Sequence, residues 1–195
     1  MENQSTMQPN KAKRRFQWNA SFIARIGIFG SITTILYVMP YLQFNIPIFP
    51  SFLDFHFDEV PIFIAGFAYG PLAAMMVNII KFVIKLPMSS TGMIGELGDL
   101  IYTTAFVVPA ALYYAKNRTR KGALIGFAIG FVCQLIVSST ANYFFILDLY
   151  GISGHEIKLG MVLSAFLPFN AVKNLLVILI TYPIYKRVHK IVELI

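Results

Sequence analysis

The 195-residue sequence has few charged side chains. Asp, Glu, Lys and Arg make up 13% of it, against about 25% in an ordinary soluble domain, whereas 57% of residues are hydrophobic and the mean hydropathy is +0.67. These values exclude a water-soluble fold, and we predict an all-α integral membrane protein. Six crossings of about 20 apolar residues each would leave no room for a soluble catalytic domain.

The residues on which many enzymes and metalloproteins depend are also scarce. The single cysteine, Cys133, excludes a disulfide within the chain and a four-cysteine zinc site. The three histidines have no metal-ligand spacing, and no GxxxxGK[ST] loop is present to hold ATP phosphates. We therefore expect no metal, no cofactor and no enzymatic activity.

One short run does match an enzyme motif. Gly151-Ile152-Ser153-Gly154 fits the GxSG run of rhomboid-type intramembrane serine proteases. Ser153 is expected in a loop, however, and no later apolar stretch carries a histidine to act as its base. A loop turn is the better interpretation, and a small intramembrane serine hydrolase that uses Ser153 is the alternative from a different class.

Basic residues cluster before the first apolar run, in a mid-chain gap and after the last run. Eleven of the sixteen lie there: Lys11, Lys13, Arg14, Arg15, Lys116, Arg118, Arg120, Lys121, Lys186, Arg187 and Lys190. The positive-inside rule makes all three clusters cytoplasmic, with residues 1–16 as a basic tail. Basic arms that bind nucleic acid would not adjoin apolar spans so regularly, so no nucleic-acid partner is expected.

The apolar runs set the predicted topology. They are Phe22–Tyr41, Val60–Leu86, Leu97–Ala115, Ala123–Leu147 and Leu159–Tyr185. Gly70-Pro71 should split the second run, because proline cannot donate a backbone hydrogen bond and disfavours a helical residue before it. Six transmembrane segments with cytoplasmic termini result, in one membrane-embedded domain over residues 1–195. The second segment, from about Phe55 to Tyr69, rises only about 22 Å, so it must be tilted, buried or incomplete.

The long loop Tyr41–Glu59 falls on the outer face in this topology. It is rich in apolar residues that would be costly to leave in water, Phe49 and Leu53 among them. We predict that it folds back as a lid over an outward-facing cavity, with Phe49 and Leu53 as ligand contacts. The alternative is an interfacial loop that rests among lipid headgroups.

Polar side chains inside the late apolar runs indicate a binding site. Lys173 lies near the middle of Leu159–Tyr185, where an ammonium group is expensive unless a partner or a water-filled cavity meets it. Asn170 and Asn174 share its helical face, and the preceding segment offers Gln134, Ser138 and Asn142. We predict ligand contacts from Asn142, Asn170 and Lys173. The alternative is a set of interhelical hydrogen bonds, which are common in membranes.

The outer segment Pro87–Gly95 is rich in turn-forming residues and hydroxyl groups. Thr91, together with Glu96 just beyond it, is predicted to contact a polar ligand. Lys81 and Lys85, one helical turn apart, are expected to pair with Glu96 or Asp99 for structural reasons.

Small residues recur on the first helix at Ala20, Ala24, Gly27 and Ser31. Such a strip lets another helix approach closely, either from a partner protein or from within the chain. The glycines Gly122, Gly126 and Gly130 are expected to serve internal packing.

Three runs resemble the membrane-embedded S components of energy-coupling-factor (ECF) vitamin transporters, and within them the riboflavin-specific RibU group. They are DFHFDEVPIFIAGFAYGP from Asp54 to Pro71, STGMIGELGDL from Ser90 to Leu100, and PFNAVKNLLVILITYPIYK from Pro168 to Lys186. One departure is Met93, which stands where the family's TGG-like turn has glycine.

The resemblance implies a six-helix subunit in a bacterial plasma membrane that captures riboflavin from outside for ATP-driven uptake. Its partners would be a transmembrane coupling protein, docked on Ala20 and Ala24, and two cytoplasmic ATPases. Riboflavin would be the transported ligand and not a cofactor, held by Asn142, Asn170 and Lys173 under the first loop. An S component for another vitamin and a purely structural membrane adaptor are further alternatives.

Overall fold

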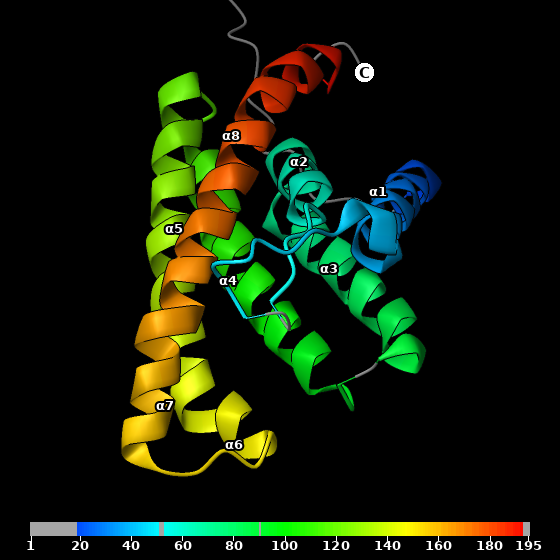
Figure 1. Cartoon of the computed structure of the whole chain (residues 1–195). Helices are drawn as coiled ribbons and strands as arrows, with labels where there is room; N and C mark the ends of the chain where they lie inside the picture. The colour runs from blue at the N-terminus through cyan, green and yellow to red at the C-terminus, as the bar shows by residue number, and fades with distance from the viewer. Residues whose placement is uncertain (1–18, 51–52, 90, 193–195) are drawn as a thin grey trace, which may run out of the picture.

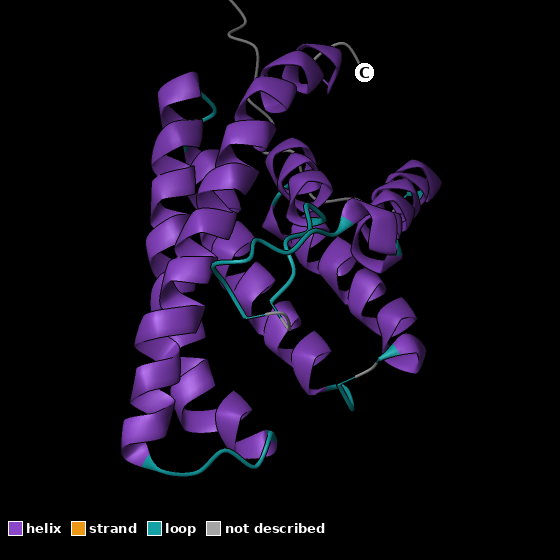
Figure 2. Cartoon of the chain, viewed as in Figure 1, coloured by secondary structure: helices purple, strands orange, loops and turns teal. Residues whose placement is uncertain are grey.

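The computed structural model describes residues 19–50, 53–89 and 91–192, so the predicted basic tail 1–16 lies outside it. Its helices are α1 (Ala20–Val38), α2 (Glu59–Tyr69), α3 (Pro71–Lys85), α4 (Ile94–Lys116), α5 (Arg120–Ala141), α6 (Leu147–Leu149), α7 (His155–Met161) and α8 (Leu167–Val192). Short 3₁₀ turns follow α1 and α3. Figure 2 shows the all-helical architecture that the hydropathy predicts.

Two of the long helices are continuous through a π turn. Asn142–Ile146 joins α5 to α6, and Val162–Phe166 joins α7 to α8. With these joins, five segments of the described chain are long and apolar enough to cross a membrane: α1, Pro71–Met88, α4, Arg120–Leu149 and His155–Tyr185. The protein is therefore a multi-pass membrane protein.

The predicted break at Gly70-Pro71 is confirmed. α2 ends at Tyr69, Gly70 has a φ of 101° and α3 begins at Pro71. The predicted start of α2 near Phe55 is wrong, because Phe55 forms an antiparallel bridge with Phe44 across the first loop. The helix begins at Glu59 instead. Its 11 residues rise about 16 Å, and nine of them are buried, so α2 is a short central helix.

The helices form two groups around α2. α1 packs against α2 and α3, whereas α5 packs against α4 and α8 (Figure 1). The α3–α4 and α6–α7 connections lie at one end of the molecule, and the α4–α5 connection and the end of α8 lie at the other. The first loop runs between the two groups.

Aromatic residues fill the core between α2, α4 and α5. The ring of Phe63 meets those of Phe106 and Phe127 at centroid distances of 4.7 and 5.0 Å, and Phe67 stacks on Tyr114 at 4.5 Å. These five residues are fully or almost fully buried. Their ring contacts pack α2 against α4 and α5 over large apolar surfaces.

Close packing of α4 on α5 depends on glycine, as the sequence predicts. A β carbon at Gly130 would lie 2.2 Å from the carbonyl oxygen of Phe106, and one at Gly126 would lie 2.9 Å from that of Ala110. Any side chain at Gly130 would therefore separate the two helices.

The turn before α4 places a methionine in a left-handed conformation. Met93 has a φ of 71°, and its backbone N–H donates to Ser89 Oγ at 2.8 Å. Among the described residues it is the one position other than glycine with a positive φ. A β carbon is disfavoured in this backbone conformation, so glycine would suit the position better than methionine.

We predict that Met93→Gly stabilises the protein by about 1 kcal/mol, because removal of the β carbon relieves backbone strain and the exposed side chain loses little packing. The midpoint of thermal unfolding in detergent measures the effect. Met93→Ala, which keeps the β carbon, is the matched control and should not raise the midpoint. An equal gain from both variants would contradict the backbone explanation.

Candidate functional site

A cavity of about 600 Å³ lies between the first loop, α4, α8 and the π turn that follows α5. This volume falls within the range of about 300–1,000 Å³ that small-molecule sites occupy. The cavity is lined by six of the seven residues predicted as ligand contacts: Leu53, Thr91, Glu96, Asn142, Asn170 and Lys173. Residues from four separate parts of the sequence therefore meet around one space.

The seventh predicted contact, Phe49, supports the first loop from within. Its ring meets Phe169 edge-on at a centroid distance of 5.5 Å and lies 5.8 Å from Phe55. Phe55 is fully buried and stacks on Phe44. The apolar loop residues therefore pack on α8 and on each other, which agrees with a loop that folds back onto the protein.

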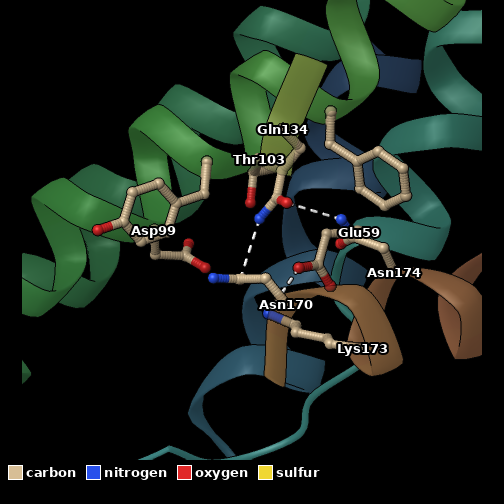
Figure 3. Close-up of a pocket in the computed structure, with 9 residues that line it drawn as sticks. Glu59, Asp99, Thr103, Gln134, Asn170, Lys173 and Asn174 are labelled. Atoms are coloured by element: carbon tan, nitrogen blue, oxygen red, sulfur yellow. Dashed lines mark hydrogen bonds and ion pairs between the residues drawn. The ribbon is translucent and has the colours of Figure 1, made fainter. Parts of the chain in front are cut away.

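The amide side chains at the floor of the cavity are bonded to one another. Gln134 Nε2 donates to Asn170 Oδ1 at 3.0 Å, and Gln134 Oε1 accepts from Asn174 Nδ2 at 2.7 Å (Figure 3). All three residues are buried. Gln134 thus joins α5 to α8, and Asn170 takes part both in these predicted interhelical hydrogen bonds and in the lining of the cavity.

Asn142 is held at the start of the first π turn. Its Oδ1 accepts from Tyr102 OH at 2.8 Å, and its Nδ2 donates to the Ser138 carbonyl at the same distance. An amide group has a second N–H and a second lone pair, so Asn142 can still bond a ligand. Tyr102 also lines the cavity.

Thr91 and Glu96 contact each other at the rim. Thr91 Oγ1 donates to Glu96 Oε2 at 2.9 Å, and Ser89 Oγ donates to the same oxygen at 2.6 Å. Glu96 is only 5% exposed. The short loop between α3 and α4 is thereby fixed beside the cavity.

Lys173 differs from the sequence expectation in one respect. It lines the cavity, but its Nζ lies 2.6 Å from Glu59 Oε1 and so already has a carboxylate partner (Figure 3). The charge of Lys173, which would be costly alone inside a membrane, is neutralised by Glu59. The sequence pattern places this residue just before a membrane segment, and in the structure it begins α2. A ligand would therefore meet an ion pair and not an unpaired ammonium group.

A second buried ion pair adjoins the first. Lys81 Nζ lies 2.5 Å from both Asp58 Oδ2 and Asp99 Oδ2, which confirms the predicted partner Asp99 and adds Asp58. Asp58 Oδ1 also contacts His56 Nδ1. Burial alone raises the pKa of Asp58, but the charge of Lys81 and the hydrogen bond with His56 outweigh it, so this pKa lies well below its ordinary value.

Four of these residues could offer ligand atoms to a metal. The donor atoms of His56, Asp58, Glu59 and Asp99 lie within 4.8 Å of one another. The ammonium groups of Lys81 and Lys173, however, already contact all three carboxylates. A divalent cation would have to displace both, so the group is better described as a cluster of ion pairs.

Both π turns adjoin the cavity. Asn142 and Ile146 of the first line it, as does Phe166 of the second. Single π turns within α-helices occur often at functional sites. They are features of the site that the sequence pattern did not predict.

Ser153 does not line the cavity. It is exposed in the connection between α6 and α7, flanked by Gly151 and Gly154 with positive φ. The histidine nearest in sequence, His155, is bonded to Tyr143 OH at 2.5 Å. This arrangement fits the loop-turn interpretation of the GxSG run.

The strip of small residues on α1 is exposed. Ala20, Ala24, Gly27 and Ser31 face away from the helix bundle, and a β carbon at Gly27 would meet nothing within 4 Å. The opposite face of α1, with Ile26 at its centre, is buried against α3 and α2. The alternative prediction, that this strip packs against another helix of the same chain, is therefore wrong.

Comparison with known proteins identifies the family. The family model described as "ECF transporter, substrate-specific component" matches residues 21–185. The chain belongs to this family. It is a transport component and not an enzyme.

Individual relatives of this ECF substrate-specific component support the family assignment. It is 26% identical over 169 residues to the riboflavin transporter RibU of Staphylococcus aureus, covering 84% of this chain and 89% of the relative. It is 28% identical over 166 residues to the riboflavin transporter FmnP of Bacillus subtilis, covering 80% and 86%. The solved "Structure and mechanism of the S component of a bacterial ECF transporter" superposes with a TM-score of 0.77 at 26% identity, covering 88% of this chain and 96% of that one.

Sequence reasoning missed several residues of this ECF component's site. The sequence pattern places His56, Asp58 and Glu59 in the outer first loop, and it gives no sign that Tyr102 lines the cavity. One signal was present: two lysines in apolar runs require buried carboxylates, and the acidic pair Asp58-Glu59 directly precedes an apolar helix.

We predict that Glu59→Gln and Lys173→Met each destabilise this ECF component by about 3–5 kcal/mol, because each leaves one buried charge without its partner. The double variant should lose less than the sum of the two, which a double-mutant cycle on thermal unfolding detects. Glu156→Gln, at an exposed site, is the control and should be neutral. Strict additivity would show that the pair contributes no coupling.

Proposed function

We propose that this chain is the substrate-binding subunit of an ECF-type riboflavin transporter, in which the 600 Å³ cavity holds the vitamin. The family match is supported by two relatives that are both named riboflavin transporters. The observation that carries the proposal is the cavity itself, which combines apolar and aromatic walls with a few fixed polar groups.

The chemistry of the walls suits a flavin. Phe166, Phe169 and Ile146 offer apolar surface to a flat ring, whereas Asn142 and Asn170 offer amide donors and acceptors to its polar edge. Thr91 and Glu96 lie at the rim, where they would meet the hydroxyl groups of a sugar-like tail. Lys173, paired with Glu59, places a polarised N–H donor beside the same edge.

We further propose six membrane segments with cytoplasmic termini, in the plasma membrane of a bacterium. The common end of the α3–α4 and α6–α7 connections (Figure 1) would be the outer side, and the basic mid-chain cluster would lie at the cytoplasmic end. The cavity then opens outward, beneath the first loop. In this topology α2 is the second segment, too short to span the bilayer alone.

The partners proposed are a transmembrane coupling protein and two cytoplasmic ATPases, since no nucleotide-binding motif is found in this chain. The exposed strip Ala20, Ala24, Gly27 and Ser31 is the proposed docking face. Helix association in lipid relies on close van der Waals contact, which small exposed residues allow.

We expect the purified protein to retain riboflavin, visible as a yellow colour, and to quench the fluorescence of added flavin. The variant Glu59→Gln/Lys173→Met should fold, because it removes both charges of the pair, but should bind riboflavin at least about tenfold more weakly, because it loses a charged hydrogen-bond donor. A flavin fluorescence titration measures the affinity.

Lys158→Met is the matched control, because Lys158 pairs with Asp148 outside the cavity lining. It should bind riboflavin as the unmodified protein does, and so should Ser153→Ala. A colourless protein that leaves flavin fluorescence unchanged would refute riboflavin as the ligand.

For the docking face, we expect Ala20→Leu/Ala24→Leu to abolish uptake of labelled riboflavin by cells while flavin binding by the purified subunit persists. The bulky side chains would hold a partner helix away from α1 without touching the cavity. Ile32→Phe, exposed on another side of α1, is the control and should leave uptake intact. Joint loss of binding and uptake would instead point to damage within the subunit.

A further inference from the structure

A second, much smaller hollow lies behind the cavity. It measures about 20 Å³ and is lined by Glu59, Thr103, Gln134 and Asn174, among others. It shares four lining residues with the large cavity: Asp99, Tyr102, Asn170 and Lys173. These four side chains form a partition with a ligand-sized space on one side and a water-sized space on the other.

Two oxygen atoms at this hollow have no hydrogen-bond partner among the described residues. They are Glu59 Oε2 and Thr103 Oγ1, on side chains that belong to residues only 3% and 2% exposed. Figure 3 shows both residues directed toward the space beside Gln134. An ionised carboxylate oxygen that is buried without a partner is costly, and a hydroxyl group likewise requires one.

We propose that the small hollow is a binding site for a single water molecule, which donates to Glu59 Oε2 and accepts from Thr103 Oγ1. The volume exceeds the minimum of about 10–15 Å³ that one water needs but leaves no room for a second. The two oxygens suit one water molecule, because the ionised carboxylate of Glu59 can only accept a hydrogen bond and the hydroxyl of Thr103 can donate one. The water completes the hydrogen bonding of the Glu59–Lys173 pair that a buried ion pair requires.

A monovalent cation is the competing occupant, since three carboxylates face only two lysines in the adjacent cluster. The ammonium group of Lys173 argues against it. Its Nζ lies 2.6 Å from Glu59 Oε1, so a cation on the other oxygen of that carboxylate would lie close to a like charge. The amide oxygens of Gln134 and Asn170 already accept hydrogen bonds as well.

The test uses the sign of a stability change in the ligand-free protein. Thr103→Val preserves side-chain volume and removes the hydroxyl. If water bonds to that hydroxyl, the variant loses a hydrogen bond and its unfolding midpoint falls by about 2–4 °C. If the hydroxyl is truly unpartnered, its removal relieves a buried polar group and the midpoint rises, which overturns the proposal.

The matched control is Thr181→Val. Thr181 Oγ1 is also buried without a partner among the described residues, but Thr181 lines neither cavity. Its substitution should not lower the midpoint, and equal responses at the two positions would overturn the water site. Replacing sodium chloride by choline chloride at constant ionic strength should leave the Thr103 result unchanged, whereas dependence on sodium would identify a bound cation instead.

A crystal structure of the unmodified protein at a resolution that reveals waters gives the direct readout. We expect a peak within hydrogen-bond distance of Glu59 Oε2 and Thr103 Oγ1, with no anomalous signal after a rubidium soak. An empty hollow or a rubidium peak refutes the proposal. Because neither experiment requires flavin, failure here is distinguishable from failure of the proposed transport function.

Discussion

Charge compensation at the start of α2 is the constraint on which the rest of the structure depends. Asp58 ends the first loop and Glu59 begins α2. Each contacts a lysine that comes from another helix, Lys81 of α3 and Lys173 of α8. Neither an acid nor an amine is tolerated alone when it is buried between apolar helices, so α2, α3 and α8 are tied to one point. The end of the first loop, which lines part of the cavity, is positioned by the same bonds.

The cavity and the bonds that hold the helices together are inseparable in this protein. Gln134 joins α5 to α8 by bonding Asn170 and Asn174, and Asn170 also faces the large cavity. A polar group inside a membrane bundle must be bonded to something, and here Asn170 bonds to Gln134 while it also faces the cavity. The binding surface is therefore preorganised by the contacts that specify helix packing.

Local chemistry explains what could be predicted from the sequence. The break at Gly70-Pro71, the apolar segments and the need of Lys173 for a partner all follow from the properties of single residues or short windows. The identity of that partner does not, because Glu59 is brought to Lys173 only by the packing of α2 on α8. The misplaced start of α2 has a similar cause, since an apolar Phe55 suits a helix as well as it suits the bridge to Phe44.

The π turns were beyond prediction for another reason: one extra residue in a turn leaves no mark on composition or hydropathy. Each such turn shifts the angular phase of all later residues in its helix by about 100°. The rest of α6 and of α8 is thereby rotated relative to the preceding segment. A one-residue deletion in Asn142–Ile146 or Val162–Phe166 would restore regular α-geometry and redirect one wall of the cavity, without a break in the helix. Homologous chains can in this way acquire differently shaped interiors while their transmembrane scaffold stays the same.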